Sequence, residues 1–416
     1  MRNRIFTLAL VVAFSLNGFA ARVATDRAWY LAGEAMRVSV AADDASIVYA
    51  ELCDTYGLAA GVVIGLEKGA GTGTMELPSD LHSGYYVLSV YTRDDTQVSH
   101  RLVAVVNPLR KSVDDDIEWV ADDSCWAADK GAADLADRKR LDVAETDGHI
   151  IKARVKNTAD GQKFNGSQIR PSLSIVGKQI HYFEGKMVDD STAVFNTYGV
   201  HGRLPLVLTA ISPTGVSLPI EMVSPFASLL PKRLPHLVFH YRRNEVEARS
   251  LDMQRHQMAI APAKRELQLG SIDDDTAIDG VPLDYDDTLF GNKPDITYNL
   301  DEYRQFLTIR EAMIEYVTSV VRKRVNGVTR LSILREQERY DSSLPTLVLI
   351  DGMPVSDTEQ LLNYDARRLH YINIYDSQYT FGYGMYSGII SFVTRSGRLT
   401  NYPTERHAQY LVYEFP

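Results

Sequence analysis

The stretch LPTLVLIDGMPVSD, from Leu344 to Asp357, decides how the C-terminal part of the chain folds. Its apolar run, Thr346 to Ile350, is typical of a strand that is buried on both faces. Asp351-Gly352 then turns the chain, because Gly tolerates a positive φ and Asp can cap its own backbone. The stretch therefore predicts a buried strand followed by a tight turn, and the role of that turn is structural rather than catalytic.

Patterned segments on both sides of this stretch complete an α+β unit over residues 301–400. Thr308-Ile309-Arg310-Glu311 is a capping box at the start of an amphipathic helix. Asn326-Gly327 separates two strand-like runs, which is the strongest short pattern for a hairpin. Three later segments predict a short helix and two strands: Thr358 to Asn363, Tyr371 to Tyr375 and Ile389 to Thr394. Helix, hairpin and strands together indicate an α+β domain.

These segments resemble the plug domain of TonB-dependent outer-membrane receptors. Four ordered submotifs carry the resemblance: Ile350-Asp351-Gly352-Met353-Pro354-Val355, Ile372-Asn373-Ile374, Tyr383-Gly384 and Gly388 to Gly397. The resemblance implies a structural plug motif made of Ile350, Asp351, Gly352, Pro354, Gly388 and Gly397. A receptor adds a barrel of about twenty strands after its plug. Only a short tail follows Gly397 here, so we expect a plug-like domain without its own barrel.

The N-terminus, residues 1–20, has the pattern of a signal peptide. Arg2 and Arg4 precede an apolar run, Ile5 to Leu16, that is too short to span a membrane. Small residues before Ala21 indicate cleavage after Ala20. We therefore expect an exported periplasmic protein, either soluble or peripheral at the inner face of the outer membrane.

Two β-rich regions precede the α+β unit. Residues 21–107 contain short β-prone runs separated by turn residues, as in a β-sandwich. DRAWYLAGEAMRVSV (Asp26 to Val40) and LPSDLHSGYYVLSVYT (Leu77 to Thr92) resemble macroglobulin-like domains. Residues 146–225 resemble immunoglobulin-like or carboxypeptidase-regulatory-like sandwiches. The expected fold class is therefore multidomain and mostly β, with two sandwiches followed by the plug-like α+β domain.

Shifts in composition separate the remaining segments. Residues 108–145 are rich in Asp and Ala and are expected to form a linker. Residues 226–300 predict an irregular connecting region, and residues 401–416 predict a C-terminal tail.

Missing sequence motifs and the net charge argue against several classes of protein. The nucleophile elbow, the zincin helix, the Walker A loop and Cys-x-x-Cys are all missing, so we expect no enzyme, no catalytic residue, no cofactor and no metal. With 44 Lys and Arg against 54 Asp and Glu, the net charge of −10 argues against nucleic acid as a partner. No small-molecule substrate is evident. Cys53 and Cys125 either form a disulfide after export or remain two separate thiols.

An aromatic cluster in the plug-like region suggests where a partner binds. Its members are Tyr379, Phe381, Tyr383, Met385 and Tyr386. They either pack on the domain's own sheet or leave at least two side chains exposed, and aromatic and Met side chains are enriched in interfaces.

The order of domains resembles exported proteins of Bacteroidetes-type bacteria, some of which have been tied to the Plug subunit of the type nine secretion translocon. The leading hypothesis is a non-enzymatic periplasmic protein that docks on, and closes, an outer-membrane β-barrel of a translocon or receptor. Two alternatives stay open. One is a periplasmic or cell-surface scaffold or adhesion protein with a relic plug domain, and the other is a carbohydrate-active or proteolytic enzyme of unfamiliar type.

Overall fold

The computed structural model describes residues 22–43, 45–94, 98–110, 117–120, 126–128, 145, 148–159, 161–176, 180–240, 245–253, 255, 293–325, 328–335, 344–397 and 407–416. The signal peptide predicted for residues 1–20 lies outside these ranges. No helix in the described part of the chain is both long enough and apolar enough to cross a membrane. The chain forms two compact units, Met1–Ala144 with Ser228–Met253, and Glu145–Ala227 with Gln254–Pro416.

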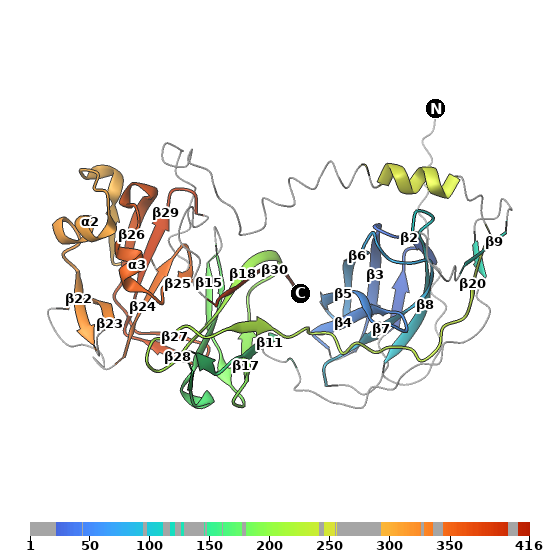
Figure 1. Ribbon diagram of the computed structural model, residues 1–416, viewed down its shortest axis with the longest axis horizontal. Coiled ribbons are helices and arrows are strands. Elements are labelled where there is room, and N and C mark those ends of the chain that lie inside the picture. Colours follow the sequence, from blue (N-terminus) through green and yellow to red (C-terminus); the bar gives the residue numbers. More distant parts are fainter. Residues whose placement is uncertain are drawn as a thin grey trace. The chain divides into compact units, whose positions relative to one another are not determined.

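The first unit is built on a β-sandwich, drawn in blue in Figure 1. One sheet has the order β1-β3-β6, with bounds Arg22–Thr25, Ala35–Ala41 and Ala70–Glu76. The other has the order β2-β8-β7-β4-β5, with bounds Trp29–Leu31, Ser99–Val106, Gly84–Tyr91, Ile47–Cys53 and Leu58–Gly65. Apolar side chains of both sheets, among them Val38, Leu52 and Leu88, form one core between them. A core formed by side chains from two facing sheets is the defining feature of a β-sandwich.

The Asp26 to Val40 motif forms a local hydrogen-bond network. The Tyr30 hydroxyl donates to Asp26 Oδ1 at 2.5 Å, and the backbone N–H of Arg37 donates to the same oxygen at 3.1 Å. Glu34 Oε2 accepts from the backbone N–H of Leu31 at 2.9 Å. Gly33 has φ +89, which favours glycine in this turn. The motif thus fixes the turn between β2 and β3.

A third, small sheet joins two segments that we expected to be irregular. β9 (Ile117–Val120) and β10 (Trp126–Ala128) come from the expected linker, and both pair with β20 (Leu237–His240). Leu237 and Phe239 are buried with Leu31 and Val106 of the sandwich, and helical residues 245–253 add Val246 to this cluster. Parts of 108–145 and 226–300 therefore belong to the first unit, because each segment covers backbone that the other would leave unpaired.

The second unit contains the other sandwich. One sheet has the order β16-β17-β11-β19, with bounds Lys186–Met187, Thr192–Thr197, His149–Val155 and Ile220–Met222. The facing sheet has the order β15-β14-β18-β30, with bounds His181–Glu184, Arg170–Ile175, Gly202–Ile211 and Gln409–Phe415. A hairpin of β12 (Thr158–Ala159) and β13 (Gln162–Lys163) and the 3-10 helix η1 (Gly166–Gln168) complete it. Phe195, Leu208 and Phe415 lie in its core.

The expected C-terminal tail, 401–416, supplies a strand of this sandwich. β30 pairs antiparallel with β18 from Gly202↔Phe415 to Leu208↔Gln409. Tyr413 and Phe415 alternate inward and are buried, while Glu414 between them is exposed. The α+β domain is therefore inserted between two strands of the sandwich, since β19 precedes it and β30 follows it.

The inserted α+β domain, drawn in orange in Figure 1, is a five-stranded mixed sheet with the order β21-β26-β29-β24-β25. The strand bounds are Ile296–Asn299, Leu369–Tyr375, Gly388–Thr394, Thr346–Ile350 and Met353–Pro354. One sheet face packs on α2 (Ile309–Glu315) and α3 (Thr358–Leu362), next to the 3-10 helices η3 (Leu300–Glu302) and η4 (Ala366–Arg368). Two hairpins complete the domain: β22 (Val320–Val325) with β23 (Val328–Ile333), and β27 (Tyr379–Phe381) with β28 (Gly384–Tyr386).

The expected fold class is confirmed: the chain is mostly β, with two sandwiches followed in sequence by an α+β domain. The predicted N-cap of α2 is present, because Thr308 Oγ1 accepts from the backbone N–H of Glu311 at 3.3 Å. The Glu311 carboxylate accepts from the backbone N–H of Leu307 at 3.2 Å, one residue before the position that a capping box uses. The turn Asn326-Gly327 lies outside the described residues, but its flanking strands pair in the expected register, Val325↔Val328.

Candidate functional site

The turn after β24 joins the α+β domain to its host sandwich. Asp351 has φ +45 and is 1% exposed, and its carboxylate accepts from Thr394, from the backbone N–H at 2.7 Å and from the hydroxyl at 2.5 Å. Gly352 has φ +88, and a Cβ atom there would lie 3.0 Å from the carbonyl oxygen of Ile175 on β14. The geometry fits a structural turn, because both oxygens of the Asp351 carboxylate accept hydrogen bonds from Thr394 at the end of β29.

The other residues of the structural motif are also packed. Ile350 and Pro354 are buried. A Cβ atom on Gly388 would lie 2.8 Å from the carbonyl oxygen of Tyr375, so the two strands approach closely there. Gly397 has φ +61, and its N–H donates to Thr394 Oγ1 at 3.0 Å.

The aromatic cluster lies on the β27–β28 hairpin, and its five side chains divide into two groups. Tyr386 is 3% exposed, and Tyr379 and Phe381 are partly buried; they pack with Tyr182 of the sandwich and with the second face of the five-stranded sheet. Tyr383 and Met385 are 54% and 48% exposed. The hairpin is therefore fixed by one group and presents the other to solvent.

A polar network anchors this hairpin to the sandwich; Tyr182, Glu184 and Tyr386 are buried in it, and the Arg170 side chain is 46% exposed. Arg170 binds Glu184 through two hydrogen bonds, Nε to Oε1 at 3.1 Å and Nη2 to Oε2 at 2.8 Å. The Tyr386 hydroxyl donates to Glu184 and accepts from Arg170 Nη2 at 3.0 Å. The Tyr182 and Tyr386 hydroxyl oxygens are 2.8 Å apart. Burial raises the pKa of Tyr182 to about 12, so the neutral phenol is favoured at this position.

Beside this network, a groove of about 580 Å³ lies between the sandwich and the α+β domain. Arg170, Tyr182, Glu184 and Tyr386 line one end, and Lys323 and Arg330 line the wall formed by the β22–β23 hairpin. Apolar side chains line much of the rest: Ile211, Val328, Leu331, Leu347, Val348 and Val355. Its size is that of a typical ligand site, roughly 300–1,000 Å³.

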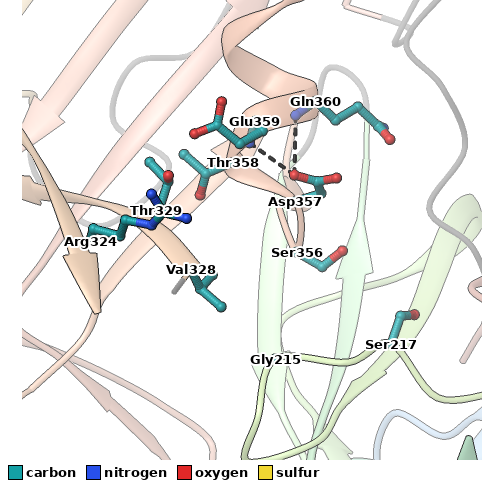
Figure 2. Close-up of a pocket in the computed structure, with 10 residues that line it drawn as sticks. All are labelled: Gly215, Ser217, Arg324, Val328, Thr329, Ser356, Asp357, Thr358, Glu359 and Gln360. Carbon is teal, nitrogen blue, oxygen red and sulfur yellow. Dashed lines mark hydrogen bonds between the residues drawn. The ribbon is translucent and has the colours of Figure 1, made fainter. Parts of the chain in front are cut away.

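A second hollow of about 650 Å³ adjoins the groove, and the two share Gly215, Val328, Thr329, Ser356 and Thr358. Figure 2 shows Val328 and Thr329 of the hairpin on one side and Gly215 and Ser217 of a sandwich loop on the other. Asp357 accepts from the backbone N–H groups of Glu359 at 2.9 Å and Gln360 at 3.2 Å, as the dashed lines in Figure 2 mark. Asp357 is therefore the N-cap of α3, and its carboxylate serves that turn.

Cys53 is the last residue of β4 in the first unit. Cys53 is buried and has a free thiol, with Sγ 3.9 Å from Glu51 Oε1, while Cys125 lies outside the described residues. Among the residues that the structure describes, no group of three or more His, Cys, Asp or Glu is placed to hold a metal ion.

Sequence reasoning missed the cationic wall of the groove. The run VRKRV, Val321 to Val325, predicts a hairpin strand and nothing more when it is considered alone. The sequence signal for a cationic surface was the cluster of three positive charges in this run, within a chain whose net charge is −10. The groove itself was not predictable, because its opposite wall comes from the sandwich.

No family model matches this chain, and no curated protein matches it. A biofilm associated protein, its BSP domain, is similar at 10% identity and TM-score 0.18, over 53% of this chain and 29% of that one. Trypsin-activated alpha-2-macroglobulin from Escherichia coli is similar at 14% identity and TM-score 0.19, over 50% and 16%. Dimeric latent PorU from Porphyromonas gingivalis is similar at 10% identity and TM-score 0.16, over 49% and 23%.

The chain thus spans less than a third of the length of each of these structures. Their similarity is too weak to support any conclusion about a shared function.

Proposed function

We propose that this chain is a non-enzymatic, exported binding protein that docks on an outer-membrane β-barrel protein through the exposed side of the β27–β28 hairpin. One observation carries the proposal. Tyr383 and Met385 remain exposed on a hairpin whose three other aromatic side chains, Tyr379, Phe381 and Tyr386, are packed. A rigid hairpin loses little conformational entropy on binding, and large apolar side chains give much contact area.

The resemblance of residues 344–397 to receptor plugs supports a barrel as the partner class. A plug inside a receptor is surrounded by barrel wall, so a plug-like domain carries side chains suited to that contact. The signal-peptide pattern of residues 1–20 supports the periplasm as the compartment in which the two proteins meet.

A second candidate, a scaffold or adhesion protein with a relic plug domain, is favoured by a different observation. Gly352 and Tyr386, two residues of the plug-like region, contact the host sandwich. In this candidate the α+β domain is a structural part of the sandwich, and no barrel is bound.

Affinity purification from outer-membrane extracts separates the two. The bait carries Y383S/M385S, and the control bait carries V188S/Y198S, which replaces two exposed apolar residues of the sandwich that are 58% and 56% exposed. We expect a β-barrel protein to be recovered with the unchanged and control baits and lost with Y383S/M385S. Recovery of the same barrel by all three baits would overturn the docking site, and recovery of no barrel by any bait would favour the scaffold.

A further inference from the structure

The β22–β23 hairpin carries a cross-strand pair of like charges. Lys323 lies directly opposite Arg330 in the ladder, and both side chains are exposed. Like charges at opposed positions destabilise a sheet, and a two-stranded hairpin has little stability to spare. An unfavourable pair at such a position is understandable if a ligand supplies the negative charge.

The groove does not supply that charge itself. Of the described residues that line it, three are cations, Arg170, Lys323 and Arg330, and Glu184 is the single carboxylate. Glu184 is already bound by Arg170 at 2.8 Å and by the Tyr386 hydroxyl. Lys323 and Arg330 therefore face the groove as excess positive charge.

The groove also exposes a short part of one strand edge, at Thr346 of β24. β25 pairs only with Leu349 and Ile350 of β24, and the Val355 N–H donates to the Val348 carbonyl at 2.9 Å. Thr346, two residues earlier, lines the groove, and no described strand pairs with this edge of it. Open strand edges accept an added strand from another chain.

We propose that this groove binds an extended acidic peptide segment of a partner protein. The segment pairs with the open end of β24 at Thr346, places carboxylates on Lys323 and Arg330, and places apolar side chains against Val328, Leu347 and Val355. The groove offers positive charge, an open strand edge at Thr346 and an apolar lining. An extended acidic peptide would contact all three, whereas a small anion would contact only the two cations, Lys323 and Arg330. This site is separate from the exposed face of the β27–β28 hairpin.

The test is fluorescence anisotropy with the full chain and the labelled peptide Gly-Val-Asp-Val-Glu-Val-Gly. We expect K323E/R330E to weaken binding by about fivefold or more, because two attractive charge contacts become repulsive. The double variant keeps a like-charged pair across the hairpin, so its melting temperature should stay close to that of the unchanged chain. The matched control is K156E/K163E, two exposed lysines of the same unit outside the groove, which should bind as the unchanged chain does.

Two altered probes test the occupant. The Asn/Gln version of the peptide should bind as weakly as the double variant binds the acidic one. A version with methylated backbone nitrogens should also bind weakly, because it cannot pair with β24. Equal binding of the acidic peptide by K323E/R330E and the unchanged chain would overturn the site. Full affinity of the methylated peptide, or its displacement by free glutamate at equal concentration, would overturn an extended peptide as the occupant.

Discussion

Gly352 packs so closely on Ile180 that a Cβ atom at Gly352 would lie 2.7 Å from Ile180 Cγ2. Gly352 belongs to the turn after β24, and Ile180 precedes β15 of the sandwich. This contact, together with Tyr410 of β30, whose hydroxyl lies 3.3 Å from Met353 Sδ, makes the inserted domain and its host one packed body. The turn after β24 thus holds two parts of the same chain together.

Replacement of Gly352 by Ala should lower the free energy of unfolding by about 3 kcal/mol. The positive φ costs an L-residue roughly 1–2 kcal/mol, and the clash with Ile180 and Ile175 adds a comparable amount. Urea denaturation measures the change. Gly161→Ala is the matched control, because Gly161 has φ +79 and a Cβ atom there would meet nothing within 4 Å, so it should cost only the backbone strain. Equal losses for both variants would show that the contact with Ile180 contributes nothing.

Two serines on β14 should respond to alanine in opposite directions. Ser174 is fully buried, and its hydroxyl has no hydrogen-bond partner among the residues that the structure describes, so Ser174→Ala should raise the free energy of unfolding by about 1 kcal/mol. Ser172 is also buried, but its hydroxyl lies 2.6 Å from Thr209 Oγ1. Ser172→Ala should therefore lower stability by about 1 kcal/mol. Thermal and urea unfolding of the two variants provide the comparison, and a loss of stability in Ser174→Ala would mean that its hydroxyl is satisfied in solution.

Stability should fall in alkaline solution partly because of Tyr182. Its pKa is about 12 in the folded chain, raised by burial from the ordinary 10.0. The unfolded chain releases this proton first, so the contribution of Tyr182 is present below pH 10 and is lost as the pH rises from 10 toward 12. Tyr182→Phe should flatten the dependence of the unfolding free energy on pH in this window. Tyr198→Phe, at a 56% exposed position, should leave the slope unchanged, and a slope that is the same in all three proteins would contradict the assignment.

Cys53 should react with thiol reagents only when the first unit unfolds. It is fully buried, and burial together with the nearby Glu51 carboxylate raises the pKa of its thiol. Labelling of the native chain under non-reducing conditions should therefore leave Cys53 unmodified, and labelling in urea without reductant should modify it. Peptide mapping identifies the modified residue. If Cys53 stays blocked in urea until a reductant is added, it forms a disulfide in the exported protein.

The sequence predicts local structure well where one short pattern carries the whole signal. The apolar run before Asp351, the N-cap at Thr308 and the hairpin around Asn326-Gly327 are of this kind. Pairings between distant segments are not predictable in this way. The run at Leu237 is compatible with a strand, but its partners β9 and β10 lie in a stretch whose Asp and Ala content indicates a linker.

For the candidate site too, local features were predictable from the sequence and contacts between distant segments were not. Composition alone singles out Phe381, Tyr383 and Tyr386 as residues that either pack on the domain's own sheet or contact a partner. Their division into packed and exposed groups depends on Tyr182 and Glu184, about two hundred positions earlier in the chain. Lys323 and Arg330 could not be recognised as a site, because the facing wall of the groove belongs to another domain.

The position of β30 has a consequence for biosynthesis. During translation, β18 emerges long before the strand that pairs with it, and the whole inserted domain is made in between. Until then, the edge of β18 and the core around Leu208 lack Tyr413 and Phe415, which are buried against them in the finished fold. The host sandwich is therefore the last part of this unit to close, and in the interval its open edge is the place where a chaperone would be needed most.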